Sequence, residues 1–429
     1  MKYLIPLLLV LPLSAGLAAQ SGALDLQQAI ALTLEHHPLL QQNRAETEAA
    51  IAATGAARAA KYPQATGMAS YSHLAPTGYV EFPTGGEMIR SSFLAPDTYN
   101  AAVDVSYTLF DFGRAQTGID LAENRKALSE TSGEVQRQSL ALQTIQYFYQ
   151  AHFLQEAIAV QDRQLGALRL NLEQTEKLRD NGEATAYEVL STEVRISAAE
   201  NQRSDLETQL RAAYIELERL TGQPDLDRTA LVHEWVDTTR REQLPVAQGD
   251  RPELQLARLR ERGAALQEVL AGEAFKPTVV ADVQAGLKNQ ILPDTRAILP
   301  NYVAGARLTV PIFTGYRNRY ALAEARASRE AAGYARANTE ATIGSEVRQA
   351  TDRLNTAYDK IERSRLQVRQ ASEAAELARL KYANGVITNL DLLASEVAVS
   401  EAEINQLRTI FDYTLDTYLL KQALGLPLY

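Results

Sequence analysis

Two stretches of this chain place a glycine, a threonine and an acidic residue at identical spacing, the second 203 residues after the first. In each, the threonine follows the glycine by three residues and the acid follows the threonine by three: Gly182, Thr185 and Glu188, then Gly385, Thr388 and Asp391. Glycine suits the left-handed residue that closes a helix. Threonine suits the N-cap of the next helix, whose first turn stabilises negative charge. Each stretch therefore predicts the tip of a helical hairpin, and two tips at a fixed offset indicate an internal repeat.

No group of residues typical of an enzyme accompanies these acids. The sequence has no glycine-rich phosphate loop and no nucleophile elbow. Its five histidines lack the spacing of metal ligands, at His36, His37, His73, His152 and His233. We interpret the pair beside Pro38 as a feature of a helix start rather than a metal site. The sequence therefore predicts no catalytic site, no metal site and no cofactor, and an enzyme is only the third of three alternatives for its function.

Composition restricts the class of protein further. The chain has 429 residues, of which 46% are hydrophobic and 22% charged, as expected for a folded protein of two modules or a repeat. The formal net charge of −10, without a basic stripe, argues against a nucleic-acid partner. The absence of cysteine means that neither disulfides nor a lipid on cysteine can hold the protein in place.

The first 20 residues are typical of a secretory signal peptide. Lys2 precedes an apolar run from Tyr3 to Leu13 and a small-residue stretch from Ser14 to Ala19. The alternative, a membrane anchor, is disfavoured because the apolar core is short. No other stretch approaches the ~20 apolar residues of a spanning helix. We therefore expect residues 1–20 to be removed near Ala18 to Gln20 and the mature protein to be exported.

The rest of the chain divides into two repeats on either side of a linker. Landmarks ahead of the strands recur at an offset of 214 residues, whereas later landmarks recur at 203. A longer loop in the first repeat, Ala75 to Asp97, absorbs the difference, which predicts a surface position for it. The first helix is expected from Leu24 to about Lys61. We assign the first repeat, the linker and the second repeat to residues 21–224, 225–250 and 251–429, with hairpin tips at 181–188 and 384–391.

Each repeat contains two segments of ~11–13 residues in which apolar and polar residues alternate, long enough to cross a membrane as tilted strands. They lie at about 62–74, 98–110, 277–288 and 301–311. The polar faces carry Asp104, Asp282 and Arg307, so these faces must line water. The opposite faces carry small aliphatic residues and tyrosine, which suit outer-membrane lipid. The sequence therefore predicts transmembrane β-strands with a water-filled lumen on one side.

The helices and strands together predict an assembly of several copies. The helix after the second strand runs to about Asp180, roughly 100 Å, and the returning helix has coiled-coil spacing. Strands in lipid cannot leave unpaired edges, and four are too few to close a barrel. We expect a homotrimer with 12 strands; a dimer with eight is the alternative. The predicted fold class is mainly α with transmembrane β, a long α-helical coiled-coil barrel joined to a β-barrel completed by trimerisation, with two internal repeats.

Over nearly its whole mature length the chain resembles the TolC-like outer-membrane efflux proteins, or outer membrane factors. The resemblance rests on the duplication, the paired tips and two junctions between strand and helix, at Phe110, Gly113 and Arg114 and at Phe313, Gly315 and Arg317. It implies a trimeric outer-membrane exit channel of a tripartite efflux or type I secretion system in a Gram-negative bacterium, projecting into the periplasm. It also implies two partners, a periplasmic adaptor (membrane fusion) protein and an inner-membrane pump of the RND, ABC or MFS type.

The resemblance further implies a role for the tips. In the family, hydrogen bonds and ion pairs among tip residues hold the periplasmic end closed, and an acidic ring narrows the entrance. The matching acids here are Glu188 and Asp391, and the family's tip tyrosine falls on Tyr382, so these three residues are expected to form the constriction. The family's adaptors would meet the tips at Gly182, Ala184, Thr185, Gly385, Val386 and Thr388. Two positions that carry an arginine and a second acid in some members are Ile387 and Ala394 here, so the closing contacts must differ.

Alternatives remain at this point. The acids could serve only as helix starts, and the glycines only as turns. A periplasmic coiled-coil scaffold or stalk without a channel is the rival function, although a scaffold has no need of strands with a charged face opposite a lipid-like one. The substrate, whether drug, metal or protein, is not distinguished by the sequence.

Overall fold

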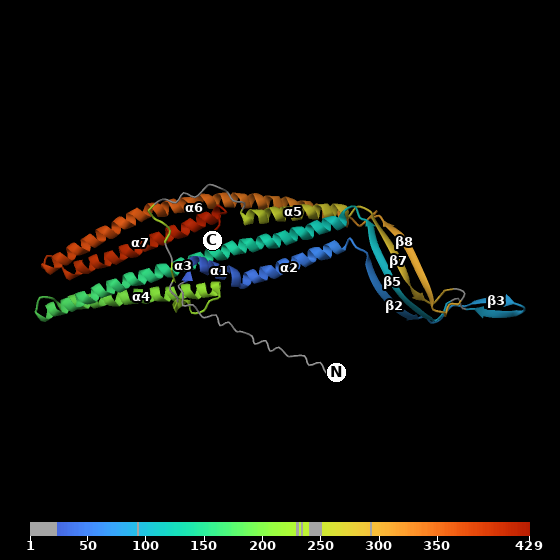
Figure 1. Ribbon diagram of the computed structural model, residues 1–429, viewed down its shortest axis with the longest axis horizontal. Coiled ribbons are helices and arrows are strands. Elements are labelled where there is room, and N and C mark those ends of the chain that lie inside the picture. The colour runs from blue at the N-terminus through green and yellow to red at the C-terminus, as the bar shows by residue number, and fades with distance from the viewer. Residues whose placement is uncertain (1–23, 92–93, 229–230, 233–234, 240–250, 292–293) are drawn as a thin grey trace, which may run out of the picture. The chain divides into compact units, whose positions relative to one another are not determined.

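The computed structural model describes residues 24–91, 94–228, 231–232, 235–239, 251–291 and 294–429 (Figure 1). The expected signal peptide, residues 1–20, and residues 240–250 of the expected linker lie outside this part of the chain. The chain forms two compact units. The hairpin unit contains Met1–Pro38, Arg137–Ala247 and Glu346–Tyr429, and the sheet unit contains Leu39–Gln136 and Gln248–Ser345.

The sheet unit is built on four antiparallel strands. These are β2 (Gln64–His73), β5 (Asp97–Phe110), β7 (Thr278–Lys288) and β8 (Leu299–Thr309), and they lie in the order β2-β5-β7-β8. The outer edges of β2 and β8 pair with no other strand in the described part of the chain. No helix among the described residues is both long and apolar enough to span a membrane.

The register of the sheet places the charged strand residues on a single face. Asp104 lies opposite Gln284, Asp282 lies opposite both Ser106 and Gly305, and Arg307 lies opposite Val280. Residues directly opposite one another in antiparallel strands project from the same face, and so do residues two apart along a strand. Asp104, Asp282 and Arg307 therefore share one face, as the alternation in the sequence predicted.

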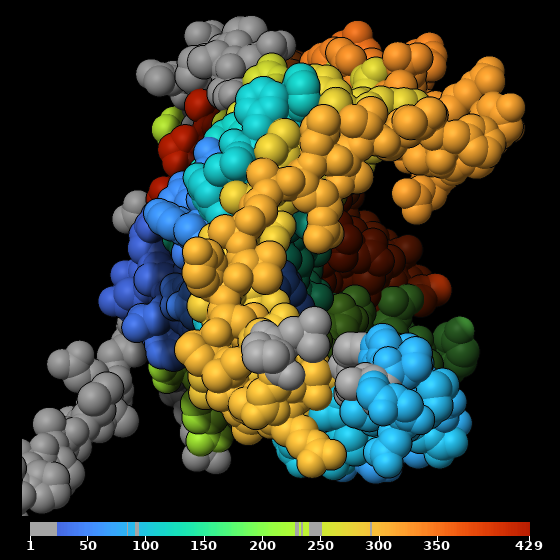
Figure 2. Space-filling view, turned by 90° about the vertical axis from the view of Figure 1, so that its right-hand side faces the viewer, coloured from blue at the N-terminus to red at the C-terminus, as the bar shows by residue number. Residues whose placement is uncertain are grey.

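The connection between β2 and β5 differs from the expected loop. It contains a hairpin of β3 (Val80–Thr84) and β4 (Glu87–Ser91), which extends beyond the end of the four-stranded sheet (Figure 1). Figure 2 shows it as a separate light-blue protrusion. Gly85 and Gly86 have φ of 64° and 99°, as a tight turn between two strands requires. The prediction of a plain loop was wrong because Pro83 interrupts the alternating pattern that would otherwise indicate a strand.

The helices of the sheet unit are held together by hydrogen bonds from asparagine side chains to backbone carbonyls of a neighbouring helix. They are α2 (Pro38–Ala59), α5 (Pro252–Glu273) and the first parts of α3 (Arg114–Asp180) and α6 (Arg317–Ala383). The Asn43 side-chain amide donates to the Ser129 carbonyl at 3.1 Å, which holds α2 on α3. The Asn124 amide donates to the Leu259 carbonyl at 3.0 Å, which holds α5 on the other side of the same helix segment.

The hairpin unit contains two long helical hairpins. The first pairs the end of α3 with α4 (Ala186–Thr221), and the second pairs the end of α6 with α7 (Asn389–Ala423). A short helix, α1 (Leu26–His36), packs on the first hairpin and ends before Pro38. The expected single helix from Leu24 to Lys61 is thus divided, because Pro38 has no amide hydrogen to continue it. Short segments β1 (Leu24–Asp25), η1 (Leu226–Arg228) and β6 (Leu231–Val232) complete the unit, with β1 and β6 parallel.

The duplication seen in the sequence is also a duplication of structure. α3 and α6 each have 67 residues, and their limits differ by the same offset of 203. Both returning helices are followed by a left-handed glycine, Gly222 and Gly425, each with φ of 71°. The core of the first hairpin includes Phe148, Leu154 and Leu217, all essentially inaccessible to solvent.

The close approach of β5 and β7 gives a testable prediction. A Cβ added to Gly286 would lie within 2.7 Å of the Ala102 side chain and collide with the Ala101 carbonyl, whereas one added to Gly67 on β2 would meet nothing within 4 Å. Gly286→Ala should lower the free energy of unfolding by about 1–3 kcal/mol, the range for overpacking. Urea unfolding of the detergent-solubilised protein measures this, with Gly67→Ala as the control. Equal midpoints for the two variants would contradict the prediction.

Candidate functional site

Both hairpin tips are built by the same local hydrogen bonds. In the first, the Glu183 amide donates to the Leu178 carbonyl at 2.8 Å, and Gly182 has φ of 82°. In the second, the Val386 amide donates to the Lys381 carbonyl at 2.9 Å, and Gly385 has φ of 68°. This pattern, with a left-handed glycine after the last turn, satisfies the carbonyls that a helix end leaves unpaired.

The acids Glu188 and Asp391 close the capping boxes of α4 and α7. One oxygen of Glu188 accepts from the Thr185 amide at 2.7 Å and from the Thr185 hydroxyl at 3.1 Å. One oxygen of Asp391 accepts from the Thr388 hydroxyl at 2.7 Å and from its amide at 3.1 Å. These bonds hold the pKa of Asp391 below its ordinary value. Both acids thus act as helix starts, and each carboxylate is fixed at the tip.

A groove between the two tips brings together some of the predicted residues. It has a volume of about 1080 Å³ and is lined by both hairpins, including Ala184, Glu188, Tyr382, Gly385 and Thr388. The remaining predicted tip residues, Gly182, Thr185, Val386 and Asp391, are exposed and lie outside the groove lining. Glu188 and Tyr382 therefore line the same groove, whereas Asp391 does not.

Sequence reasoning missed an ion pair in the same groove. Arg379 donates to both carboxylate oxygens of Glu396, at 2.6 and 2.7 Å, and both residues line the groove. Arg379 lies one turn before Tyr382, so its position near the tip could be predicted from the sequence. Its partner Glu396, however, lies on the returning helix α7. Ile387 also lines the groove and Ala394 is exposed, so neither replaces the charged groups that some family members carry there.

The strand-to-helix junctions of the sheet unit are turns with defined hydrogen bonds. In the first, Phe110 is followed by Gly113 with φ of 97°, and the Arg114 guanidinium donates to the Glu273 carbonyl at 3.0 Å. The second turn contains Gly315 with φ of 61° before Arg317 starts α6. The aromatic side chains of the two turns are exposed to solvent, namely those of Phe110, Phe313 and Tyr316. The predicted junction residues therefore form tight turns with aromatic side chains on the surface.

The apolar face of the sheet carries aromatic residues near both ends. Tyr71 and Tyr99 pair across β2 and β5 with ring centroids 5.3 Å apart, and Tyr302 of β8 is 80% exposed on the same face. Tyr107 and Phe110 lie near the other end. The eight steps along the strand from Tyr99 to Tyr107 span ~27 Å at ~3.4 Å each, close to the ~25 Å apolar band of outer-membrane barrels. This face has the pattern of a lipid-facing surface with two aromatic belts.

Comparison with known proteins supports this interpretation. The family of outer membrane efflux proteins matches residues 29–223 and 244–426, most of both repeats. The chain belongs to the outer membrane efflux protein family. This confirms the resemblance, the outer-membrane location and the part of the predicted fold class that joins a helical barrel to a β domain, and it makes the protein an efflux channel of that membrane. The family is one of channels and not of enzymes.

Individual members of the outer membrane efflux protein family match along most of the chain. The proteases secretion protein PrtF of Dickeya chrysanthemi is 26% identical over 91% of this chain and 85% of its own length. The outer membrane protein TolC of Vibrio cholerae is 22% identical over 99% of this chain and 96% of its own. The crystal structure of VceC, also from Vibrio cholerae, superposes with a TM-score of 0.80 at 21% identity, covering 94% of this chain and 97% of VceC. The VceC comparison shows a shared fold.

Below the tips, a buried polar network connects the two hairpins of this efflux protein. The side-chain amide Nδ2 of Asn171 donates to the side-chain Oδ1 of Asn389 at 2.9 Å, and Nδ2 of Asn389 donates to the Thr192 hydroxyl at 3.1 Å. The Thr192 hydroxyl lies 3.0 Å from the Glu188 carbonyl. All three side chains are buried, and Asn389 is 1% exposed. The network ties the start of α7 to α3 and α4, which a local sequence pattern does not reveal.

No group of three or more metal-binding side chains is found among the residues that the structure describes. His152 contacts Glu156 at 2.6 Å, and His73 contacts Asp97 at 2.8 Å. Each of these histidines therefore meets one carboxylate rather than a set of ligands.

The polar network predicts a stability effect at Asn389. Asn389→Ala removes both of its hydrogen bonds and leaves Asn171 and Thr192 buried beside an apolar side chain. Loss of a buried partner costs about 1–3 kcal/mol, so the free energy of unfolding should fall by that amount. Asn405→Ala is the matched control, because Asn405 lies on the same helix and bonds Gln367 at the exposed surface. Urea unfolding measures both, and equal losses would show that the network adds nothing.

Proposed function

We propose that three copies of this chain form one outer-membrane exit channel. The observation that carries the proposal is a four-stranded sheet with two open edges, one apolar face and one face bearing Asp104, Asp282 and Arg307. Open edges are not tolerated in hydrocarbon, so the sheet must pair with other copies. Three copies supply 12 strands, with the charged face lining the lumen. A dimer of eight strands is the alternative assembly.

The channel would serve a tripartite system. PrtF is named for the secretion of proteases and the family for efflux, so the exit step of efflux or type I secretion fits this chain. In such a system a periplasmic adaptor would contact the tips, and an RND, ABC or MFS pump in the inner membrane would supply the substrate. Exposed tip residues support the adaptor contact: Gly182, Thr185, Gly385, Val386 and Thr388 are open to solvent, and Ala184 is half-buried.

The acids of the tips would form the constriction of the periplasmic entrance, together with Tyr382. The lowered pKa of Asp391 keeps this exposed carboxylate ionised at neutral and mildly acidic pH. Three copies would place three Glu188 and three Asp391 side chains around one axis. Such a ring attracts cations and repels anions.

The rival function, a periplasmic scaffold or stalk without a channel, accounts for the long hairpins only. It offers no reason for a face with charged groups opposite a face of valine, alanine and tyrosine in the same strands. A channel requires both faces.

The proposal predicts conductance by a trimer. The purified full-length protein, added to a planar lipid bilayer, should open discrete channels that prefer cations. A lysine-reactive crosslinker applied to the same sample should give bands of one, two and three chains. A protein that stays monomeric or dimeric and never conducts would overturn the trimeric channel and favour the scaffold.

A second prediction concerns the entrance. The double variant Glu188→Gln, Asp391→Asn removes both charges but keeps side chains that can still accept a hydrogen bond from the N-cap threonine, as glutamine does in natural capping boxes. Single-channel conductance should rise or the preference for cations should fall, because the acidic ring is gone. Salt gradients of potassium chloride across the bilayer measure the preference as a reversal potential.

The control separates charge from helix capping. Thr185→Ala with Thr388→Ala removes the capping hydroxyls and keeps both acids. If the constriction depends on charge, this control retains the cation preference of the unaltered protein. Unchanged conductance and selectivity in the neutralised variant would refute the assignment of Glu188 and Asp391 to the constriction.

A further inference from the structure

The four connections between helix and strand in the sheet unit lie at one end of the sheet (Figure 1). β2 and β7 begin at this end, and β5 and β8 finish there. The register shows it, because Gln64 pairs with Ser106 and Thr278 pairs with Thr309. The four connections, here together named the collar, are residues 60–63, 110–116, 273–277 and 310–319.

Hydrogen bonds join each connection of the collar to the next. Lys61 of the first connection donates to the side-chain oxygen of Gln116 in the second. Arg114 of the second donates to the Glu273 carbonyl of the third at 3.0 Å. The Asn318 side-chain amide of the fourth donates to a backbone carbonyl of the third at 2.8 Å. The collar is therefore one continuous structure within a single chain.

Every connection of the collar carries an exposed aromatic side chain. Tyr62 is 69% exposed and Phe313 is 75% exposed. The others are Phe110, Phe112, Phe275 and Tyr316. A β-bulge after Thr108 places Phe110 opposite Val279, and so on the apolar face of the sheet. The collar thus continues the apolar face, and its aromatic side chains are typical of the depth at which lipid headgroups lie.

Every connection also carries a lysine or an arginine, and four of these side chains are exposed. They are Lys61, Lys276, Arg317 and Arg319. None of the four forms an ion pair with any residue that the structure describes. Lys61 bonds a neutral amide, and Lys276 lies 5.8 Å from the centre of the Phe112 ring. The exposed cations of the collar therefore lack an acidic neighbour.

The acids of the collar are bound by other groups. Asp111 accepts hydrogen bonds from two backbone amides of its own turn, at 2.7 and 3.1 Å. Glu273 is buried and accepts from a threonine hydroxyl at 3.0 Å. In the second repeat the position of Asp111 is taken by Thr314, and residues 310–319 contain no acid at all. The positive charge of the fourth connection is thus uncompensated.

Cations outside the collar are paired within the same unit. Arg58, just before the collar, contacts Glu123 at 2.7 Å. Arg326 and Arg329 both contact Glu268, at 3.3 and 3.0 Å. These arginines lie on the same helices as the collar cations, so the helices themselves do not prevent pairing.

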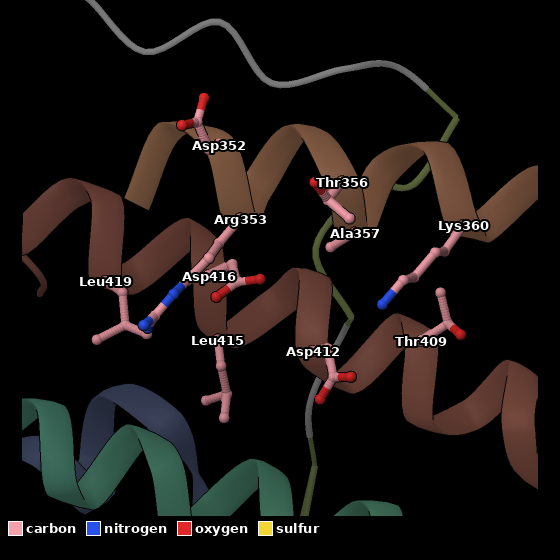
Figure 3. A pocket seen from close by; sticks show the side chains of 10 residues that line it. All are labelled: Asp352, Arg353, Thr356, Ala357, Lys360, Thr409, Asp412, Leu415, Asp416 and Leu419. Carbon is pink, nitrogen blue, oxygen red and sulfur yellow. The ribbon is translucent and has the colours of Figure 1, made fainter. Parts of the chain in front are cut away.

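The hairpin unit also balances its charges internally. Figure 3 shows Arg353 and Lys360 of α6 in a pocket of about 380 Å³ that Asp412 and Asp416 of α7 also line. Burial raises the pKa of Asp416, and the neighbouring Arg353 and Lys360 oppose that rise. Cations in such a pocket need no ligand from outside the chain, whereas those of the collar do.

We propose that the collar binds the headgroups of acidic phospholipids, such as phosphatidylglycerol, in the periplasmic leaflet of the outer membrane. Its lysines and arginines contact the phosphates, for which the arginine guanidinium has a matching geometry. Its aromatic side chains lie against the start of the acyl chains. Phosphatidylethanolamine binds less well, because its ammonium group offsets the charge of its phosphate. The collar belongs to one chain, so this inference does not depend on the number of copies in the channel.

A membrane lipid fits the collar better than a free phosphate ion does. A phosphate ion would use the cations only and would leave the exposed aromatic side chains without an apolar neighbour. A phospholipid supplies a phosphate and an acyl chain in one molecule. The apolar face of the strands leads directly to the collar, so a lipid beside the strands has its headgroup at that level.

Native mass spectrometry of the detergent-solubilised full-length protein tests the proposal. The protein is titrated with phosphatidylglycerol and, separately, with phosphatidylethanolamine that has the same acyl chains. The dissociation constant should be lower for phosphatidylglycerol by about fivefold or more, since one lysine or arginine near an acidic lipid surface has an effect of that size. Equal affinities for the two lipids would overturn the proposal.

A matched pair of variants locates the binding site. Arg317→Gln with Arg319→Gln should remove most of the preference for phosphatidylglycerol. Arg326→Gln with Arg329→Gln removes two positive charges from the same helix, but these arginines already bind Glu268, so the preference should remain. Equal losses in the two double variants would indicate a general effect of net charge and would refute the assignment to the collar.

Two further measurements separate binding from folding and lipid from phosphate. Arg317→Lys with Arg319→Lys keeps both charges and should retain the preference, which a merely structural role of these arginines would not allow. Protein loaded with phosphatidylglycerol should also keep its lipid during size-exclusion chromatography in excess inorganic phosphate. Loss of the lipid to phosphate would contradict the lipid assignment and leave the collar as a site for free anions.

Discussion

The requirement that every backbone amide and carbonyl in a bilayer be hydrogen-bonded governs this structure. β2 and β8 each present an open edge of about ten residues or more, and hydrocarbon offers those groups no partner. A soluble sheet protects its edges with charges or a covering element, whereas a membrane sheet must close. In the proposed trimer, copies of the chain supply the missing strands, and a lumen lined by the charged face follows from closure of the barrel.

The structural role of the acids at the hairpin tips is compatible with the role in conduction that we propose for them. Glu188 and Asp391 each accept hydrogen bonds from the N-cap threonine of the following helix. A carboxylate bound in this way cannot sweep through many rotamers, so the backbone of the helix start determines where the charge lies. The interpretation as a helix start and the interpretation as an acidic constriction are therefore compatible. The two acids differ in position, because Glu188 lines the groove together with Tyr382, whereas Asp391 is exposed to solvent outside the groove lining.

The sequence predicted the elements whose signals are local and missed those that depend on distant partners. Alternation in the strands predicted the shared face of Asp104, Asp282 and Arg307, and spacing of glycine, threonine and acid predicted both tips. The β3–β4 hairpin was missed because Pro83 breaks its alternation. The network of Asn171, Thr192 and Asn389 joins residues from three helices, so no local sequence pattern predicts it. Arg379 was missed because its partner Glu396 lies on the returning helix.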